Sequence, residues 1–570
     1  MKKKVIKAAL ASCLVFSTLS IHPVLAVDNQ TTESAKSKNL IVLIGDGMGP
    51  AQVSAARNYL MYNKNIDHLT LDSIYVGQAT TYADRGEDGG TIVSGVVTDS
   101  ASAGTAFATG NKTYNAGISV SNEDVSKPFA SVIEAAEIEG KSTGLVTTAR
   151  ITHATPAVYA SHVRSRDNEA AIASQYLESG VDVLFGGGSS FFLSKADGGK
   201  RTDKSIISDF EAKGYSYIDN ASELQSLSAT SGKALGLFSS SHIPYVLDRT
   251  AETPSLAEMT SKALSILEQD EDGFTIMIEG GRIDHASHAN DFPSTVQEVL
   301  DFDAAVKVAL DYAKKDGNTS IVITADHETG GLSLSRDNIY EMNLDLWDKQ
   351  VHSSEYIVSK LNAAVTIDDI KKIVKANTWI TDLSDEEAKI IHAGDGSSYG
   401  REGGYNQVIS KRLLVGWSGH GHSAVDVGVW AYGPIVNLVS GQIDNTQIAK
   451  ASAQIIEVDL KTTSATMQAK YIYPKFKITR DNEVLYPAKA LAEALGAKVE
   501  WNAAAHLITI TSGTNVMKVE TNKLEVNLNG TNTGLGGHLD NGKLYLSLDA
   551  FNKLTGKNMT WDSLSERIVK

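Results

Sequence analysis

The sequence predicts an α/β protein with a doubly wound, mostly parallel sheet that is flanked by helices. The first observation is that continuous apolar runs alternate with helix-like stretches from residue 39 to about residue 440. Continuous runs, unlike alternating ones, are typical of strands that are buried on both faces of a parallel sheet. The second observation is that strand and helix patterns follow one another in turn, which favours a doubly wound arrangement.

Six apolar runs account for the expected strands. They are LIVLI (40–44), STGLVTT (142–148), VDVLFGG (181–187), FTIMIEG (274–280), SIVITAD (320–326) and VDVGVWAYG (425–433). Helical periodicity is clearest over residues 254–269 and 295–315. Residues 337–411 break this rhythm with two further helical patterns and a Gly/Ser/Tyr stretch, so we expect an insertion over the sheet edge that serves as a lid or a subunit contact. The main domain is expected to span residues 39–460.

Length and charge limit the classes to which this protein can belong. A chain of 570 residues exceeds one compact core, so we expect two or more domains. The formal net charge is -16, and 21% of the residues are charged. A negative charge disfavours nucleic-acid binding, which needs a basic surface. The composition is that of a globular protein and argues against disorder.

The first 26 residues are predicted to be a secretory signal peptide. Four lysines form a charged start, an apolar stretch follows, and Val-Leu-Ala at 24–26 offers a cleavage site. Polar residues interrupt the apolar stretch, so we expect no transmembrane segment. Cys13 is the only cysteine and lies in a weak lipoprotein-like box, which leaves lipidation open. Residues 27–38 are polar and expected to be flexible, and the mature protein would be extracellular and without disulfides.

The last hundred residues differ from the rest in charge and in pattern. Residues 471–570 hold 12 basic and 10 acidic residues, whereas residues 27–470 hold 36 basic and 58 acidic ones. An internal repeat relates LYPAKALAEALGAKVEW (485–501) to LYLSLDAFNKLTGKNMTW (544–561), and each copy reads as a strand, a short helix and a strand. We therefore expect a separate, small α+β repeat domain. We find no cluster of ligands or acid–base groups in it.

Polar side chains follow the apolar runs in six widely separated segments. These are IVLIGDGMG (41–49), VVTDSASAGTAFATG (96–110), ITHATPA (151–157) with HVRSR (162–166), FTIMIEGGRIDHASH (274–288), IVITADHETGG (321–331) and WSGHGHSAVDV (417–427). Because the carboxyl ends of parallel strands meet at one edge, where ligands bind, we expect these side chains to converge. Seven or more metal-ligating groups, a hydroxyl and an arginine are the inventory of a two-metal phosphoryl-transfer site.

Taken singly, several of these residues have ordinary structural explanations. Asp46 sits in a Gly-rich turn that fits any strand–helix corner, and Ser100 precedes a helix that it could simply cap. Arg164 and Arg166 could be solvated charges or, in a phosphate site, a planar fork for two phosphoryl oxygens. A serine at a helix N-terminus could also be a nucleophile, with the helix favouring an anion and Asp99 orienting an arginine.

The segment FTIMIEGGRIDHASH is the most informative of the six. A buried-looking strand leads into Glu279, and Asp284 and His288 are four residues apart. On a helical turn these two face the same way and can share one cation, and carboxylate with imidazole suits zinc. Similar pairs at other runs are Asp326 with His327, and His420 with His422. Each histidine alone could be structural, but it is improbable that four clusters of Asp, Glu and His occur at strand ends by chance.

Together these segments resemble the alkaline phosphatase family, in the family's order and approximate spacing. The resemblance covers residues 39–455 and rests on GDGMG, TDSASAGTAFATG, HATPA with HVRSR, EGGRIDHASH, TADHETGG and HSAVDV leading into WAYGP. It implies the family's fold, hydrolysis of small phosphate monoesters and a homodimer. Residues 471–570 resemble the copper amine oxidase N-terminal-like domain of secreted bacterial proteins. That resemblance implies a binding or spacer module toward cell wall or another protein, without a copper site.

The resemblance also implies roles for individual residues. Ser100 is similar to the family's phosphorylated nucleophile, and Arg166 to its phosphate clamp. Two zinc ions and a third cation, normally magnesium, are implied. The implied ligands are Asp284, His288 and His422 for the first zinc, Asp46, Asp326, His327 and Ser100 for the second, and Asp46, Thr155 and Glu279 for the third cation. His422 is preferred to His420 because it lies four residues before Asp426, as in the family.

Two positions, His153 and His285, differ from the enterobacterial members of the family, which have Asp and Lys there. The histidines resemble other branches, including the animal enzymes. With Asp99, they are expected to lie just outside the ligand shell. Magnesium prefers oxygen ligands, whereas imidazole suits zinc or cobalt, so His153 leaves the third cation open between Mg²⁺, Zn²⁺ and Co²⁺.

Two other functions stay open at the level of sequence. A phosphodiesterase or sulfatase of the same superfamily would be built alike, although the modified Cys or Ser motif that sulfatases need is not evident around Ser100. A secreted binding protein, with residues 471–570 as its working part and a degenerate front domain, is the second. The intact ligand set argues against that degeneracy.

Overall fold

The computed structural model describes residues 36–88, 91–361 and 365–570. The predicted signal peptide, Cys13 and most of the polar segment 27–38 therefore lie outside the described residues. Among the helices of the described part, none combines the length and the apolar character that crossing a bilayer requires.

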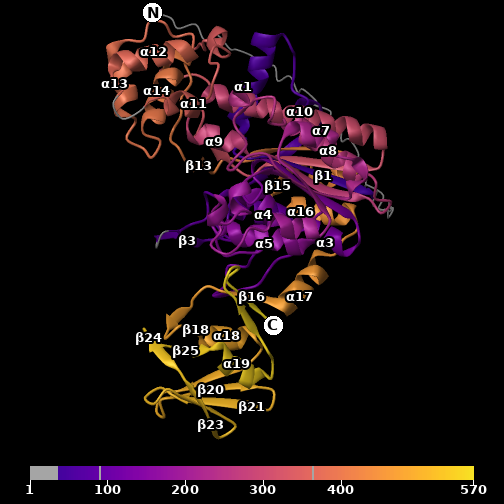
Figure 1. Cartoon of the computed structure of the whole chain (residues 1–570), viewed down its shortest axis with the longest axis vertical. Helices are drawn as coiled ribbons and strands as arrows, with labels where there is room; N and C mark the ends of the chain where they lie inside the picture. The colour runs from indigo at the N-terminus through magenta and orange to yellow at the C-terminus, as the bar shows by residue number, and fades with distance from the viewer. Residues whose placement is uncertain (1–35, 89–90, 362–364) are drawn as a thin grey trace, which may run out of the picture. The chain divides into compact units, whose positions relative to one another are not determined.

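A ten-stranded sheet forms the centre of the protein (Figure 1). Its strand order is β15-β2-β14-β11-β1-β10-β6-β7-β9-β8. In that order the strands span Gly441–Asp444, Tyr75–Thr80, Val427–Tyr432, Thr319–Ala325, Asn39–Gly45, Phe274–Gly280, Ser142–Arg150, Val183–Gly187, Lys233–Leu237 and Tyr215–Ile218. Neighbours from β11 to β8 pair in parallel, and β14 is antiparallel to both of its neighbours. The predicted mostly parallel sheet is confirmed.

The six predicted runs correspond to β1, β6, β7, β10, β11 and β14. Strands β1, β10 and β11 are buried along their whole length, which explains their unbroken apolar sequences. The sequence does not predict β2, β8, β9 and β15. Strands β2, β8 and β15 are short and partly exposed, and β9 carries lysine and glycine, so none of the four shows a long apolar run.

Helices cover both faces of this sheet (Figure 1). On one face α8 (Leu256–Leu267) and α10 (Phe292–Asp316) pack against each other, with α10 over β1, β10 and β11 and α8 over β6. The other face carries α2 (Ser100–Thr109), α4 (Ala154–Ala160) and α16 (Thr446–Ile455), which pack in the order α4, α2, α16. One hydrophobic core includes residues from both layers and from the sheet between them. The arrangement is the doubly wound one.

The insertion, residues 337–411, has a hydrophobic core of its own. Its helices are α11 (Ser354–Ser359), α12 (Ile367–Asn377), α13 (Asp385–Ala393) and α14 (Arg401–Leu413). Trp347 is fully buried there, and the core continues onto Tyr59 of α1 (Pro50–Tyr59) and Phe292 of α10. The two helical patterns read from the sequence correspond to α12 and α13.

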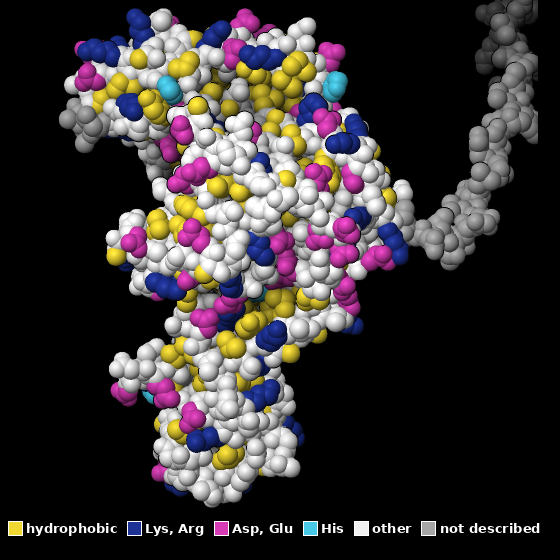
Figure 2. Space-filling model, turned by 45° about the vertical axis from the view of Figure 1, so that its right-hand side comes forward, with side chains coloured by type: hydrophobic (Ala, Val, Ile, Leu, Met, Phe, Trp, Pro, Cys, Tyr) yellow, Lys and Arg dark blue, Asp and Glu magenta, His cyan; other side chains and the backbone are white. Residues whose placement is uncertain are grey.

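Residues 471–570 fold around a third core. The two copies of the repeat are β18 (Glu483–Pro487), α18 (Ala488–Ala494) and β19 (Lys498–Asn502), then β25 (Lys543–Ser547), α19 (Leu548–Thr555) and β26 (Thr560–Asp562). Strands β18 and β25 pair antiparallel, so the two copies share a sheet. On the face drawn in Figure 2, acidic and basic side chains of the described residues are interspersed, as on a solvated surface.

Candidate active site

Three neighbouring parallel strands bring acidic side chains to one edge of the sheet. Strands β1, β10 and β11 end level with one another, because Gly45 is paired with both Gly280 and Ala325. The polar residues at these three strand ends are Asp46, Glu279, Asp326 and His327. All four are fully buried. The convergence that the sequence predicts is therefore produced by the register of the sheet.

A first ligand cluster lies between helix α9 (Arg282–His288) and strand β13 (His422–Ser423). Asp284 and His288 are one helical turn apart, and Nε2 of His288 lies 3.3 Å from Oδ2 of Asp284. Nε2 of His422 lies 3.6 Å from Oδ1 of Asp284 and 3.0 Å from Nε2 of His288. The nitrogens of both histidines therefore lie beside the carboxylate of Asp284, a combination that suits zinc. His327 also offers a ligand atom within 4.8 Å of those of Asp284 and His422.

Backbone carbonyls orient both histidines of this cluster. Nδ1 of His422 donates to the carbonyl of Thr98 at 2.8 Å, and Nδ1 of His288 donates to the carbonyl of His420. A neutral imidazole with its proton on Nδ1 keeps the lone pair on Nε2. Each Nε2 is therefore ready to bind a metal, and the carbonyls act as the outer partners that metal-binding histidines usually have.

A second cluster joins Asp46, Asp326 and His327 to the hydroxyl of Ser100. Nε2 of His327 lies 3.0 Å from Oδ2 of Asp326, 3.8 Å from Oδ1 of Asp46 and 3.3 Å from Oγ of Ser100. The backbone N–H of Gly47 donates to Oδ1 of Asp326, but Oδ2 of Asp326 and both carboxylate oxygens of Asp46 are buried without a hydrogen bond. Buried carboxylate oxygens without partners are costly, so the arrangement fits a cation between them.

A third cluster shares Asp46 with the second. One ligand atom each from Asp46, His153 and Glu279 lie within 4.8 Å of one another. Oε1 of Glu279, Nδ1 of His153 and Oγ1 of Thr155 are buried and make no hydrogen bond. The other carboxylate oxygen of Glu279 accepts from the hydroxyl of Thr147 at 2.5 Å. The atoms that remain free fit a further cation with mostly oxygen ligands.

Ser100 is the first residue of α2, and Asp99 caps that helix. Oδ1 of Asp99 accepts a hydrogen bond from the backbone N–H of Ser102 at 2.9 Å. The simple capping role considered for Ser100 is therefore wrong, because the neighbouring aspartate fills it. The hydroxyl of Ser100 lies instead beside His327, at the end of a helix whose dipole favours an anion.

Arg166 is aligned by two residues of the site. Its Nη1 donates to Oδ2 of Asp99 at 3.1 Å, and its Nη2 donates to Nε2 of His153 at 2.9 Å. Arg164 does not join them, because its guanidinium packs over the ring of Tyr114, 5.2 Å from the ring centre. The structure thus separates two arginines that the sequence alone leaves equivalent, and Asp99 orients the one beside the ligand clusters.

The buried charges shift one another's pKa values. Burial, reinforced by the neighbouring Asp326, raises the pKa of Asp46 well above its ordinary value. Burial also raises the pKa of Glu279, to about 7. Burial alone would lower the pKa of His288, but the charge of Asp284 outweighs it and raises that pKa to about 9. Without metal, this edge of the sheet holds protons that bound cations would displace.

Several residues of the site carry no sequence signal. Thr98 begins the TDSASAGTAFATG segment and Thr147 lies in the run 142–148, but neither the carbonyl of Thr98 nor the hydroxyl of Thr147 is indicated by these patterns. The ring of His242 lies 4.2 Å from that of His285 and 5.5 Å from that of His153, measured between ring centres. His242 is an isolated histidine after the unpredicted strand β9, so only knowledge of that strand would have indicated it. His285 lies 5.4 Å from His153, beside the third cluster.

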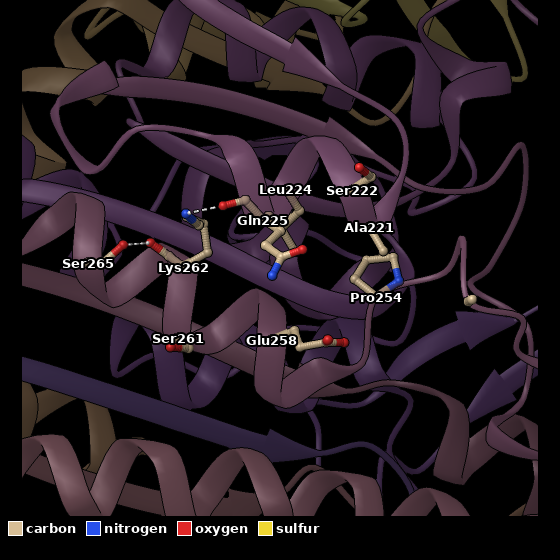
Figure 3. A pocket seen from close by; sticks show the side chains of 10 residues that line it. Ala221, Ser222, Leu224, Gln225, Pro254, Glu258, Ser261, Lys262 and Ser265 are labelled. Atoms are coloured by element: carbon tan, nitrogen blue, oxygen red, sulfur yellow. Dashed lines mark hydrogen bonds between the residues drawn. The ribbon is translucent and has the colours of Figure 1, made fainter.

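A large hollow elsewhere on the surface does not belong to this site. A cavity of about 620 Å³ lies beside α7 (Ala221–Ser226) and α8. Figure 3 shows side chains that line it, among them Lys262, which donates a hydrogen bond to the carbonyl of Gln225. Lys262 also donates to the carbonyl of Leu227. The residues that line it include no histidine and one carboxylate, Glu258, and none of them belongs to a ligand cluster. The chemistry therefore locates the reactive site better than cavity volume does.

Comparison with known proteins matches this geometry to a family. The alkaline phosphatase family model matches residues 37–458, and that of the copper amine oxidase N-terminal domain matches residues 465–569. Alkaline phosphatase 3 of Bacillus subtilis (strain 168) is 38% identical over 475 residues, which cover 80% of this chain and 98% of that protein.

Solved structures agree with the sequence comparison. A cold-active alkaline phosphatase from Shewanella sp. is 35% identical with a TM-score of 0.65, over 73% of this chain and 99% of that one. A TAB5 alkaline phosphatase mutant with one histidine changed to aspartate, and with Mg bound in its M3 site, is 27% identical with a TM-score of 0.54, over 75% and 99%. The chain therefore belongs to the alkaline phosphatase family and is a metal-dependent phosphomonoesterase.

Proposed function

We propose that the protein hydrolyses phosphate monoesters through a phosphoserine intermediate on Ser100, with two zinc ions and a third cation. One observation carries this proposal. Buried carboxylate oxygens of Asp46 and Asp326 make no hydrogen bond and lie around His327, whose Nε2 is 3.3 Å from the hydroxyl of Ser100. Free serine is a poor nucleophile, and metal coordination is one of the ways in which proteins activate it.

The three clusters fit the three cations. We assign Asp284, His288 and His422 to the first zinc, Asp46, Asp326, His327 and Ser100 to the second, and Asp46, Glu279 and Thr155 to the third cation. When bound, these cations would lower the pKa of a hydroxyl or water and neutralise phosphoryl oxygens.

The reaction consists of two displacements at phosphorus, in which Ser100, Arg166 and Asp99 take part. Oγ of Ser100 attacks phosphorus in line with the ester oxygen, which leaves as the alcohol. Water then breaks the bond between that Oγ and phosphorus and releases phosphate. Arg166 holds two phosphoryl oxygens with its planar fork while Asp99 fixes the guanidinium, and the N-terminus of α2 adds its dipole.

His153 links the third cation to the phosphate clamp. Its Nε2 accepts a hydrogen bond from Arg166, so a metal could bind this ring only at Nδ1. Metal at Nδ1 would move the ring proton to Nε2 and end that hydrogen bond. Zinc or cobalt favours the imidazole, whereas magnesium favours the oxygens of Asp46, Glu279 and Thr155 and leaves Arg166 bonded. The identity of this cation therefore affects how Arg166 is held.

We also infer that the protein acts outside the cell. The charged and then apolar sequence of residues 1–26 supports export. Residues 471–570 contribute to none of the three ligand clusters, which supports a separate role in binding cell wall or another protein.

Replacing the proposed nucleophile should abolish turnover. Ser100→Ala removes the hydroxyl that forms the covalent bond, so we expect the rate on p-nitrophenyl phosphate to fall by at least about 10³-fold. Arg166→Ala keeps the nucleophile and should lower kcat/KM by roughly 10- to 100-fold, the effect of losing charge-assisted hydrogen bonds. Ser226→Ala, at the end of α7, is the matched control. Activity of Ser100→Ala within about tenfold of the wild type would contradict the proposal.

Assays on three substrates distinguish a phosphomonoesterase from a phosphodiesterase and a sulfatase. Zinc-loaded and chelated samples are assayed on p-nitrophenyl phosphate, its diester and its sulfate analogue. We expect the monoester to react fastest, because its phosphoryl group carries two negative charges for Arg166 and the cations, whereas the diester and the sulfate ester carry one. We expect chelation to remove the activity. A protein that prefers the diester or the sulfate would belong to a different reaction class.

Changing His153 should change the metal preference. In His153→Asp the third cluster offers only oxygen ligands, so we expect added Mg²⁺ to fill the site and raise activity, while the wild type responds to Zn²⁺ or Co²⁺ as well. Metal content by elemental analysis and the rate are measured after metal-free protein is reloaded with zinc and one test cation. His392→Asn, on exposed α13, serves as the control. Equal responses of both proteins to every cation would refute the idea.

The metal-free protein should lose stability as the pH rises from about 6.5 to about 9. Below 6.5 the lowered pKa values of His153, His285 and His422 act in the opposite direction, because the unfolded chain then binds protons that these buried rings do not. Burial raises the pKa of Glu279 from 4.5 to about 7, and that of Asp46 also rises, so the folded state holds protons that the unfolded chain has lost. Folding stability then falls as these carboxyls ionise. The pKa of His288 is raised from 6.5 to about 9, so its contribution is complete below 6.5 and is lost as the pH rises through 9.

Calorimetric Tm values from pH 6.5 to 9, with and without chelator, test this expectation. Bound cations should flatten the profile, because they take the place of the protons. Chelated Glu279→Gln should show a shallower decline around pH 7 than the chelated wild type. A Tm of the chelated wild type that rises with pH across this range would contradict the prediction.

A further inference from the structure

A chain of hydrogen bonds connects the insertion to the first ligand cluster. It begins at Asp395, in the loop between α13 and α14, whose Oδ2 accepts from Nε2 of His420 at 2.8 Å. Nδ1 of His420 then donates to the backbone carbonyl of His288 at 2.7 Å. Nδ1 of His288 donates in return to the carbonyl of His420. His288 and His420 are therefore linked twice, and the insertion holds the pair from outside.

The side chain of Asp395 occupies space that is available because residue 403 is a glycine. Its Oδ1 accepts from the backbone N–H of Ser397 at 3.0 Å and from the hydroxyl of Ser397 at 2.7 Å. The carboxylate packs on Gly403 of α14, where a Cβ atom would come within 1.9 Å of Oδ2. Glycine inside a helix costs about 1 kcal/mol relative to alanine, so the space needed by Asp395 explains why glycine stands there.

The ring of His420 is fixed on one face as well as at both nitrogens. Tyr399, from the same loop of the insertion, stacks on it with ring centres 5.0 Å apart and planes inclined by 20°. With Nε2 bonded to Asp395 and Nδ1 to the carbonyl of His288, His420 has no nitrogen left for a metal. This explains physically why His422, and not His420, faces Asp284.

We propose that Asp395 and His420 are positioning residues for the first zinc site, and that the insertion thereby sets the zinc affinity of that site. The inference rests on the proposed function, since it takes His288 as a zinc ligand. The carbonyl of His420 fixes the ring of His288, whereas His422 is held by the carbonyl of Thr98, outside the insertion. Only one imidazole of the site depends on the insertion.

The test measures zinc affinity site by site. Competition with a chromophoric chelator is followed for the wild type, Asp395→Asn, His420→Gln and Gly403→Ala. Losing the outer partner of a metal-binding histidine weakens metal by about 10- to 100-fold, so we expect that loss for one zinc ion and no change for the other. Gly403→Ala should act likewise although alanine favours the helix, because its methyl group displaces Asp395.

A matched control lies on the same insertion. Asp382 is an exposed carboxylate that pairs with Arg412, so Asp382→Asn should bind both zinc ions as the wild type does. The double variant Asp395→Asn with His420→Gln should bind zinc no more weakly than His420→Gln alone, because both residues act through one chain of hydrogen bonds.

Three outcomes would overturn the inference. Unchanged zinc affinity in Asp395→Asn is the first. Equal weakening of both zinc ions is the second, because it would mean a general structural role, and a lowered Tm of the zinc-free variants would accompany it. Additive effects in the double variant are the third. A wild-type chain that binds fewer than two zinc ions would instead refute the proposed function, so the two failures are distinguishable.

Discussion

The whole site depends on one electrostatic constraint, which is that buried carboxylates cannot remain ionised side by side without cations. Asp46, Glu279 and Asp326 are fully buried, and Asp284 is 4% exposed. Two unit charges 4 Å apart interact by about 4 kcal/mol at the effective dielectric of a protein, and burial adds a further penalty to each. Histidines and Arg166 balance part of this charge, but both oxygens of Asp46 make no hydrogen bond. The arrangement is complete only with metal.

The sheet is what forces these charges together. Because β1, β10 and β11 are parallel, buried and level at their ends, the residues that follow them lie together at the same edge of the sheet. The turn after β1 must also pass close to α9. Gly47 has a φ of +71°, and a Cβ there would lie 2.7 Å from Cα of Asp284, so glycine is required. This close approach sets the first and second clusters side by side.

Sequence patterns predicted those parts of the protein whose structure is indicated by residues close together in the chain. The apolar runs of β1 and β11 and the helical spacing of Asp284 and His288 are such parts. Strand β2 and the edge strand β15 are not such parts, because their residues are partly exposed and form no continuous apolar run. The carbonyl of Thr98, which orients His422, has no side-chain signature at all.

The sequence also did not decide which of two nearby residues has a given role. For the cap of α2, the sequence indicated Ser100, whereas in the structure the cap is Asp99, one residue earlier. For His420 and His422, the resemblance to the family suggested which one is the ligand but not the role of the other histidine. That role requires Asp395, which is 25 residues away and belongs to a different core. Contacts of this kind arise from packing between segments, and a single sequence does not show them.

The two proposed zinc sites therefore depend on different parts of the fold. Asp46, Asp326 and His327 are attached directly to β1 and β11, so the second cluster persists as long as the central sheet does. His288 ends a short helix, and its outer support comes from the insertion, which has a separate hydrophobic core. Segments with separate cores can open at a lower free energy than the whole domain. Opening of the insertion would remove Asp395 from His420 while β1, β10 and β11 stayed paired. In the proposed arrangement, the first site is thus the one at which local stability of the fold would control metal binding.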